Sequence, residues 1–154
     1  MKVMVLSGAN LGRLGRREPA VYGSRGYDDL VAACQEQAGE LGLEVDCRQT
    51  DDEATMLRWL HEAADTASAV VLNPGAWSHY SYALRDAAAQ VEGLLVEVHL
   101  SQTHAREPFR HHSVISAVAV GTITGLGFDS YLLALRVIAS RLSRDLGDRS
   151  GADA

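Results

Sequence analysis

The sequence predicts an α/β protein with a flavodoxin-like, doubly wound sheet of five parallel strands and helices on both faces. Short apolar runs alternate along the chain with segments whose apolar residues recur at helical spacing. Most of the apolar runs are continuous, which is typical of parallel strands buried on both faces. The 154 residues suit one domain. We expect residues 1–144 to form it and the polar residues 145–154 to be a disordered tail.

Five apolar runs are the predicted strands, and four helical patterns follow or separate them. The strands are expected at residues 3–6, 43–47, 69–72, 94–98 and 117–120. The first helix covers about 27–41, has Asp28 and Asp29 in its first turn, where acidic groups suit the helix dipole, and stops at Gly42. The second follows the acidic residues 51–53, the third covers 81–90, and the last follows Gly127.

Charge and composition argue against several classes of protein. The net charge of −6 argues against nucleic acid as a partner, because phosphate binding needs a basic face. The sequence has no run of 18 apolar residues and too short an apolar start for a signal peptide, so we expect a cytoplasmic protein without a membrane contact. Cys34 and Cys47 are the only cysteines and are expected to be buried, reduced thiols. Lys2 is the only lysine, so a lysine-based mechanism has no well-placed candidate.

The polar residues gather in three loops that follow predicted strands. Such sheets bind ligands beyond the carboxyl ends of their strands, which selects the loops at residues 7–26, 73–79 and 99–112. The first loop is about 20 residues long, which favours a lid or binding loop. The third holds four of the six histidines. We therefore expect the functional site at this edge of the sheet.

The loops supply the parts that an elimination beside a carbonyl needs, namely a base, an acid and dipoles for the enolate. A tyrosine beside arginines can become a base. A histidine can give a proton to a leaving hydroxyl, and Asn, Ser and backbone amides can hold a carboxylate. This set favours an enzyme that acts on a small anionic substrate.

Other kinds of site have weaker support in the sequence. His99 and His104 lie five residues apart with no cysteine near, so no metal site is expected. The frame G-x-S-x-G of a serine nucleophile and the Walker motif are both absent. The glycine-containing stretch at residues 7–12 leaves a phosphate or flavin site open. The main alternative to an enzyme is a non-catalytic flavodoxin-like module that binds a small polyhydroxy acid.

Several blocks of sequence, in order, resemble the type II 3-dehydroquinate dehydratases. They are SGANLGRLGRREPAVYG at 7–23, NPGAWSH at 73–79, LRDA at 84–87, EVHLS at 97–101, ARE at 105–107 and FRHHS at 109–113. Residues 121–127 and 131–135 match the family's ending, so that the resemblance covers about residues 3–140. It implies a lyase that removes water from 3-dehydroquinate without a metal, a cofactor or a Schiff base. It also implies a homododecamer built as a tetramer of trimers.

The resemblance assigns catalytic roles to five residues. Tyr22 resembles the general base that removes the proton alpha to the ketone, and Arg17 the group that favours its tyrosinate. Asn10 resembles the residue that holds a water on the developing enolate. His99 resembles the general acid for the departing hydroxyl, with Glu97 orienting it. Because Glu97 lies in a predicted strand, it needs a partner such as His99 on any interpretation.

The same resemblance implies the binding residues. Asn73 and the backbone around Leu100 and Ser101 resemble the carboxylate site. His79 and Arg110 resemble the contacts to the substrate's other hydroxyls.

Two further positions are assigned by resemblance, and four depart from the family pattern. Arg106 resembles a residue that adds positive charge near the base, and Asp86 one that reaches a neighbouring subunit's site. The departures affect the expected affinity and specificity rather than the reaction; they are Ala9, Ser78, Tyr80 and Gln102. The sequence leaves open whether the enzyme serves aromatic biosynthesis or quinate breakdown, because the chemistry is the same.

Overall fold

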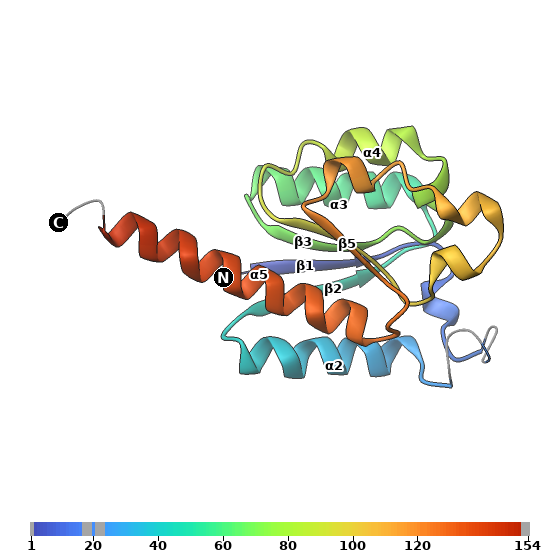
Figure 1. The fold of residues 1–154 in the computed structure, drawn as a ribbon, viewed down its shortest axis with the longest axis horizontal. Helices are drawn as coiled ribbons and strands as arrows, with labels where there is room; N and C mark the ends of the chain where they lie inside the picture. The colour runs from blue at the N-terminus through green and yellow to red at the C-terminus, as the bar shows by residue number, and fades with distance from the viewer. Residues whose placement is uncertain (1, 17–19, 21–23, 152–154) are drawn as a thin grey trace.

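The computed structural model describes residues 2–16, 20 and 24–151, and it contains one sheet (Figure 1). All five strands are parallel, in the order β2-β1-β3-β4-β5. This is the doubly wound order of the flavodoxin-like fold, so the predicted fold class is confirmed. The strands are β1 (Lys2–Ser7), β2 (Glu44–Gln49), β3 (Ala69–Asn73), β4 (Leu95–His99) and β5 (Gly121–Thr124).

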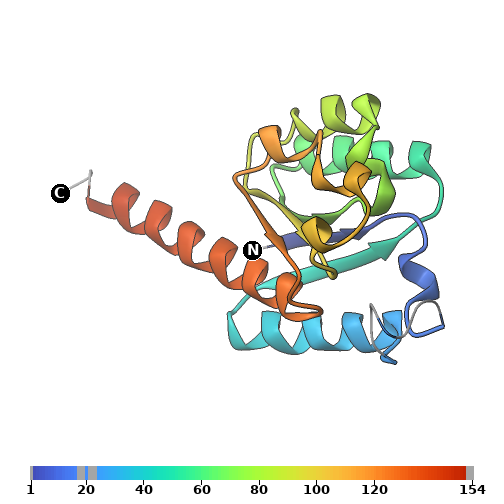
Figure 2. The ribbon, with the colours of Figure 1, turned by 45° about the vertical axis from the view of Figure 1, so that its right-hand side comes forward.

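Helices cover both faces of the sheet (Figures 1 and 2). One face carries α2 (Tyr27–Glu40) and α5 (Asp129–Gly151), and the other carries α3 (Glu53–Asp65) and α4 (Tyr82–Ala88). Short 3-10 helices lie in the connections: η1 (Leu11–Arg13), η2 (Gly75–His79), η3 (Thr103–Ala105), η4 (Pro108–His111) and η5 (Ser116–Val118). All five lie in the connections that follow β1, β3 and β4.

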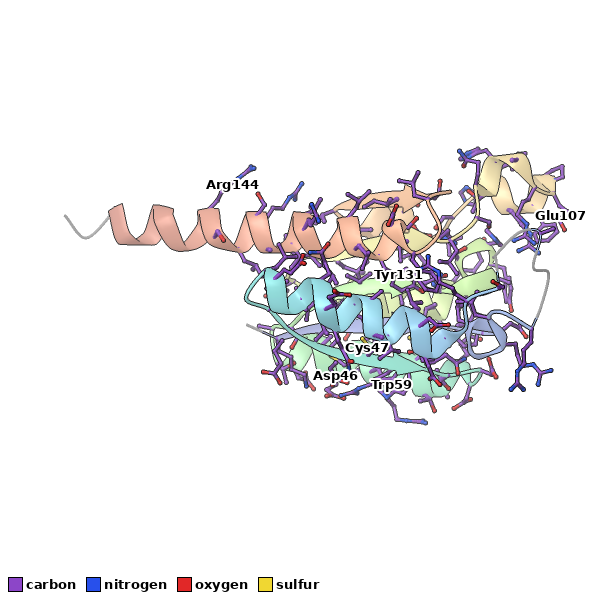
Figure 3. The ribbon with its side chains drawn as sticks, turned by 90° about the horizontal axis from the view of Figure 1, so that it is seen from below. Asp46, Cys47, Trp59, Glu107, Tyr131 and Arg144 are labelled. Atoms are coloured by element: carbon purple, nitrogen blue, oxygen red, sulfur yellow. The ribbon has the colours of Figure 1, made fainter. Side chains whose placement is uncertain are left out.

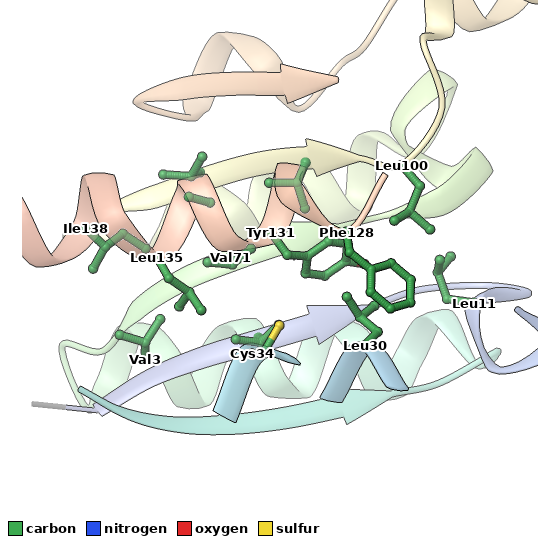
Figure 4. Close-up of a cluster of buried hydrophobic side chains, with 14 of the residues drawn as sticks. Val3, Leu11, Leu30, Cys34, Val71, Leu100, Phe128, Tyr131, Leu135 and Ile138 are labelled. Carbon is green, nitrogen blue, oxygen red and sulfur yellow. The ribbon is translucent and has the colours of Figure 1, made fainter. Parts of the chain in front are cut away.

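Two apolar clusters explain why the central strands are apolar without alternation. In β1, Val3 and Val5 pack in the cluster under α2 and α5, where Tyr131 and Leu135 also lie (Figure 4). Met4 belongs to the second cluster, under α3 and α4. Successive strand residues point to opposite faces, so a strand covered on both sides needs apolar residues at every position.

The fifth strand lies later in the chain than the sequence predicts. Residues 117–120 were expected to form it, but Gly121–Thr124 do. The apolar stretch instead ends η5 and leads into the strand, and Val118 and Ala119 pack against the second cluster. β5 is an edge strand, half exposed, so its own sequence carries only one large apolar residue, Ile123. The prediction of this strand from its apolar residues is therefore wrong.

Helix α5 continues through Gly151, into the segment for which the sequence predicts a disordered tail. Its last turns project beyond the sheet (Figure 2). A helix that leaves the body of the domain needs no apolar face, which accounts for the polar composition. Within the described part of the chain, no helix combines the length and apolar character needed to cross a membrane.

The only lysine is held at the β2 edge of the sheet. Lys2 Nζ lies 3.1 Å from Asp46 Oδ2, and Asp46 also pairs with Arg48 at 2.7 Å. Arg48 extends the network to Glu62 at 2.6 Å and lies over the Trp59 ring; Figure 3 labels Asp46 and Trp59. Lys2 begins β1, and the residues that follow the strand's other end line the pocket described next.

Candidate active site

A pocket opens beyond the carboxyl ends of β1, β3 and β4, where ligands bind in this class of sheet. It holds about 680 Å³ of empty space, with its open mouth included. The three loops selected from the sequence all contribute to its wall. The lining residues are Ala9, Asn10, Leu11, Leu14, Asn73, Gly75, Ala76, His79, His99, Leu100, Ser101, Thr103, Arg106 and Arg110.

The loop after β1 is locked against the loop after β3. Gly8 donates its N–H to Asn73 O at 2.8 Å, and a Cβ on Gly8 would lie 2.6 Å from Pro74 O. Only glycine permits this approach. Asn10 follows with a left-handed backbone (φ 70°), and its N–H donates to Asp51 Oδ1 at 2.7 Å. Asn10 is thereby fixed at the pocket rim.

Asn73 ends β3 and is buried among polar groups below the pocket. Its Oδ1 accepts a hydrogen bond from Gly75 N at 3.1 Å. The hydroxyl of Tyr131, fully buried on α5, bonds to Ser7 at 3.0 Å and also to Asn73. Burial raises the pKa of Tyr131, so its hydroxyl stays neutral. The Asn73 side chain is therefore held by groups from α5 and the η2 turn.

The Glu97–His99 pair lies at the end of β4. Both side chains point to the same face because the residues are two apart in a strand. Glu97 Oε1 lies 2.8 Å from His99 Nε2. Burial raises the pKa of Glu97, but hydrogen bonds from His99, Ser116 and Ser113 lower it more, and the pKa lies below its ordinary value. Glu97 is therefore an anion, and His99 Nε2 carries the hydrogen that it accepts.

His79 faces His99 across the pocket. The two rings are stacked with centroids 6.3 Å apart. His79 Nδ1 donates to the carbonyl of His112 at 2.8 Å, which leaves Nε2 as the second nitrogen. Burial lowers the pKa of His79, and the nearby His99 and Arg110 also lower it. A neutral His79 can accept a hydrogen bond from a ligand hydroxyl at Nε2.

Two arginines supply positive charge to the pocket wall. Arg106 Nη1 donates to Ser101 Oγ at 3.3 Å, so its guanidinium group lies beside the residues that follow β4. Arg110 Nε pairs with Glu107 Oε2 at 2.7 Å. Both guanidinium groups are mostly buried, which strengthens their attraction for an anionic ligand.

Among the predicted site residues that the structure describes, Asp86 is the one that lies away from this pocket. Asp86 lies on α4, and its exposed carboxylate approaches Arg85 at 3.3 Å. Tyr22 and Arg17 lie outside the described residues. The other nine predicted residues lie in the pocket or, for Glu97, directly behind it.

The four departures from the family pattern fall in different surroundings. Ala9 lines the pocket, and buried Ser78 lies 3.2 Å from His79 Nδ1. Tyr80 is mostly exposed, so its size does not fill the pocket. Gln102 accepts a hydrogen bond from Thr124 at 3.2 Å. In the described residues, no cluster of three His, Cys, Asp or Glu side chains could hold a metal ion.

Four residues that support the site had no predicted role. Tyr131 contacts Asn73 and is itself bonded to Ser7, and Ser113 and Ser116 hold Glu97. Ser113 lies in one of the recognised blocks, but a serine in a loop gives no sign of the carboxylate it bonds. These partners are visible only once the chain is folded.

Comparison with known proteins places this pocket in an enzyme. A 3-dehydroquinate dehydratase of Salinispora tropica is 64% identical over 141 residues, covering 92% of this chain and 99% of the relative. One of Mycobacterium tuberculosis is 55% identical over 140 residues, covering 91% and 95%. The crystal structure of type II dehydroquinase from Propionibacterium acnes superposes with a TM-score of 0.89 at 54% identity, covering 90% of this chain and 96% of that one.

The fold and these relatives define the chain as a hydro-lyase on a flavodoxin-like sheet. The family model described as dehydroquinase class II matches residues 1–139. The chain belongs to this family.

Proposed function

We propose that the chain dehydrates 3-dehydroquinate to 3-dehydroshikimate by an anti elimination that passes through an enolate. The observation that carries the proposal is the buried Glu97–His99 pair, which ends at a pocket containing two arginines, in a member of this family. The relatives named as 3-dehydroquinate dehydratases support the choice of substrate. The product serves aromatic biosynthesis or arises in quinate breakdown, and the site chemistry is the same for both.

In the proposed reaction, Tyr22 removes the proton alpha to the ketone. A tyrosine is a poor base at its reference pKa of about 10, so Arg17 beside it favours the tyrosinate. The electron pair from the broken C–H bond moves onto the ketone oxygen as an enolate. A water held by Asn10, at the rim of the pocket, stabilises that charge.

His99 then acts as the acid. Its Nε2 is occupied by Glu97, so Nδ1 is the nitrogen left to give a proton to the departing hydroxyl. As the C–O bond breaks, water leaves and a double bond forms in conjugation with the ketone. Glu97 stays ionised and stabilises the charged ring that precedes transfer.

The remaining pocket residues bind the substrate. Asn73 and the backbone at Leu100 and Ser101 hold the carboxylate, while His79 and Arg110 contact the other hydroxyls. Arg106 adds positive charge near the base and the anion. Neutral His79 suits this role because its Nε2 accepts a hydrogen bond from a hydroxyl.

We also propose that the chain works as a homo-oligomer, a dodecamer built from trimers, in which Asp86 completes a neighbouring site. Its exposed position on α4, away from the pocket of its own chain, supports this assignment. A charged residue at such a contact needs polar partners, and the arginine-rich loops provide them.

Purified protein is expected to convert 3-dehydroquinate with a rise in ultraviolet absorbance, because the product is a conjugated enone. Chelators and borohydride should leave the rate unchanged, since the proposed mechanism uses neither a metal nor a lysine adduct. The measurement is a steady-state assay with and without each reagent. Chelator inhibition, or a borohydride-trapped adduct detected by mass spectrometry, would rule this mechanism out.

Mixing two impaired variants tests the shared site. Tyr22→Phe and Asp86→Ala are prepared separately, dissociated, mixed and reassembled. If Asp86 acts in trans, some sites then combine an intact Tyr22 with an intact Asp86, and activity should exceed the average of the two parents. No gain after demonstrated subunit exchange, or a fully active monomer in sedimentation, would place Asp86 outside a shared site.

A further inference from the structure

Glu97 is a buried carboxylate that needs several hydrogen-bond donors around it. It is fully buried directly behind the pocket, where an ionised carboxylate is costly unless its oxygens are hydrogen-bonded. One bond from His99 leaves most of its acceptor capacity unused. The remaining partners therefore decide whether this carboxylate stays charged and where it points.

Two serines from the chain after η4 supply those partners. Ser113 Oγ lies 2.7 Å from Glu97 Oε1 and 3.0 Å from Oε2. Ser116 Oγ donates to Oε2 at 2.6 Å. Both carboxylate oxygens thus accept at least one hydroxyl. None of the buried side-chain polar atoms in the described residues lacks a partner.

The direction of these hydrogen bonds is fixed by the turn that carries the serines. Ser113 Oγ accepts the N–H groups of Ile115 and Ser116, each at 3.1 Å, so its own hydrogen is directed to Glu97. Ser116 Oγ lies 3.1 Å from Thr122 Oγ1, and Thr122 pairs with Glu97 in the β4–β5 register. Thr122 can donate to Ser116 while Ser116 donates to Glu97. Two hydroxyls are therefore oriented toward one anion, and a third can support one of them.

The same segment also holds the second histidine of the pocket. The carbonyl of His112 accepts from His79 Nδ1, and Val114 N donates to Ser78 O at 2.7 Å. Residues 112–116 thus touch His79 directly and His99 through Glu97. This connects the orientation of the two stacked rings to one short turn.

We propose that Ser113 and Ser116 are positioning residues for the dehydration, acting on His99 by keeping Glu97 an oriented acceptor. This inference rests on the proposed acid role of His99. A protonated Glu97 could no longer accept at both oxygens, and His99 Nε2 would lose its fixed partner. The ring would then be free to rotate, and Nδ1 would no longer be aimed at the leaving hydroxyl.

The charged groups around Glu97 set the sign of the expected pH dependence. His99 faces it from β4 and His79 from η2, while Arg110 acts on His79 from η4. Bonds from Ser113 and Ser116 help to keep the pKa of Glu97 below its ordinary value, against burial, which raises it. Removing either serine should move that pKa upward. Protonation of Glu97 would then reduce activity at a higher pH than in the unsubstituted protein.

The first experiment compares Ser113→Ala and Ser116→Ala with Ser116→Thr, which keeps a hydroxyl. For each alanine variant, the loss of kcat that comes from protonation of Glu97, which lies on the acidic side of the limb assigned to Tyr22, should move up by about one pH unit, the scale of one hydrogen bond to a charged group. The KM should change much less than kcat, and Ser116→Thr should restore the profile. Ser143→Ala, on the exposed side of α5, is the matched control and should behave as the unsubstituted protein.

The second experiment needs no activity. The thermal midpoint of the full chain is measured from pH 4 to pH 8 for Ser116→Ala, alone and in a Glu97→Gln background. A carboxylate with a lowered pKa contributes stability at high pH that is lost as the pH falls. The deficit caused by Ser116→Ala should therefore be larger at pH 8 than at pH 4, and it should be independent of pH once Glu97 is Gln.

The outcomes separate this inference from the proposed function. A deficit that is equal at every pH, together with an unshifted kcat profile, would make the serines merely structural and overturn the inference. A pH-dependent deficit in a protein that fails to dehydrate 3-dehydroquinate would uphold the Glu97 contacts while rejecting the proposed reaction. A lowered kcat with an unshifted profile and no rescue by Ser116→Thr would also count against a positioning role.

Discussion

A His99→Ala variant is expected to lose at least about 10²-fold in kcat, the low end for one positioned acid or base. The substitution should lower turnover more than substrate binding, because other residues make the contacts proposed for the carboxylate and hydroxyls of the substrate. Poor leaving of hydroxide is the physical reason, because the proposed mechanism gives the departing hydroxyl no acid other than His99. Steady-state assay across pH measures the effect.

Loss of stability must be separated from loss of chemistry in this variant. Without His99, buried Glu97 keeps only its serine partners, and the free energy of unfolding should fall by about 1–3 kcal/mol. The double variant Glu97→Gln/His99→Gln removes the charge and keeps the volume. We expect it to recover much of the stability in denaturant titrations and none of the turnover. Recovered turnover would show that His99 is only a structural partner of Glu97.

The fold could be predicted because its central strands are buried on both faces. In β1, β3 and β4 nearly every position is buried beneath a helix layer, so most of their residues are apolar and the strands stand out in the sequence. β5 lies at the edge and is half exposed, so its sequence is less apolar than the residues before it, and the apolar pattern predicts the strand too early. A strand with one side uncovered has fewer apolar residues, and a continuous apolar run is what predicts a buried strand.

The site could be predicted where neighbours in sequence are also neighbours in space. Glu97 and His99 share one face of one strand, so a partner for the carboxylate was expected and is found at 2.8 Å. Ser116 is 19 residues from Glu97, in a turn with no regular pattern. Tyr131 is 124 residues from Ser7. Such contacts depend on the packing of whole elements, which local sequence patterns do not encode.

A Tyr22→Phe variant is expected to lower kcat by at least about 10²-fold, because it removes only the proposed base. The substitution keeps an aromatic ring, so substrate binding, measured by calorimetry, should survive much better than turnover. The variant also separates the two proton transfers, since His99 and Glu97 stay in place. A variant with nearly normal turnover would show that another group removes the proton.

An Arg17→Ala variant tests whether the positive charge of Arg17 favours the tyrosinate form of Tyr22. Without its cationic neighbour, the tyrosinate of Tyr22 forms less readily, so the basic form should appear at higher pH. The rate at neutral pH should fall, and the rising limb of the pH profile should move toward alkaline values, whereas Tyr22→Phe should abolish that limb. Arg58→Ala is the matched control for loss of one arginine, because exposed Arg58 lies on α3 and pairs with exposed Asp52 at the start of that helix. If Arg17→Ala lowers the rate equally at every pH, the arginine serves binding and does not activate the base.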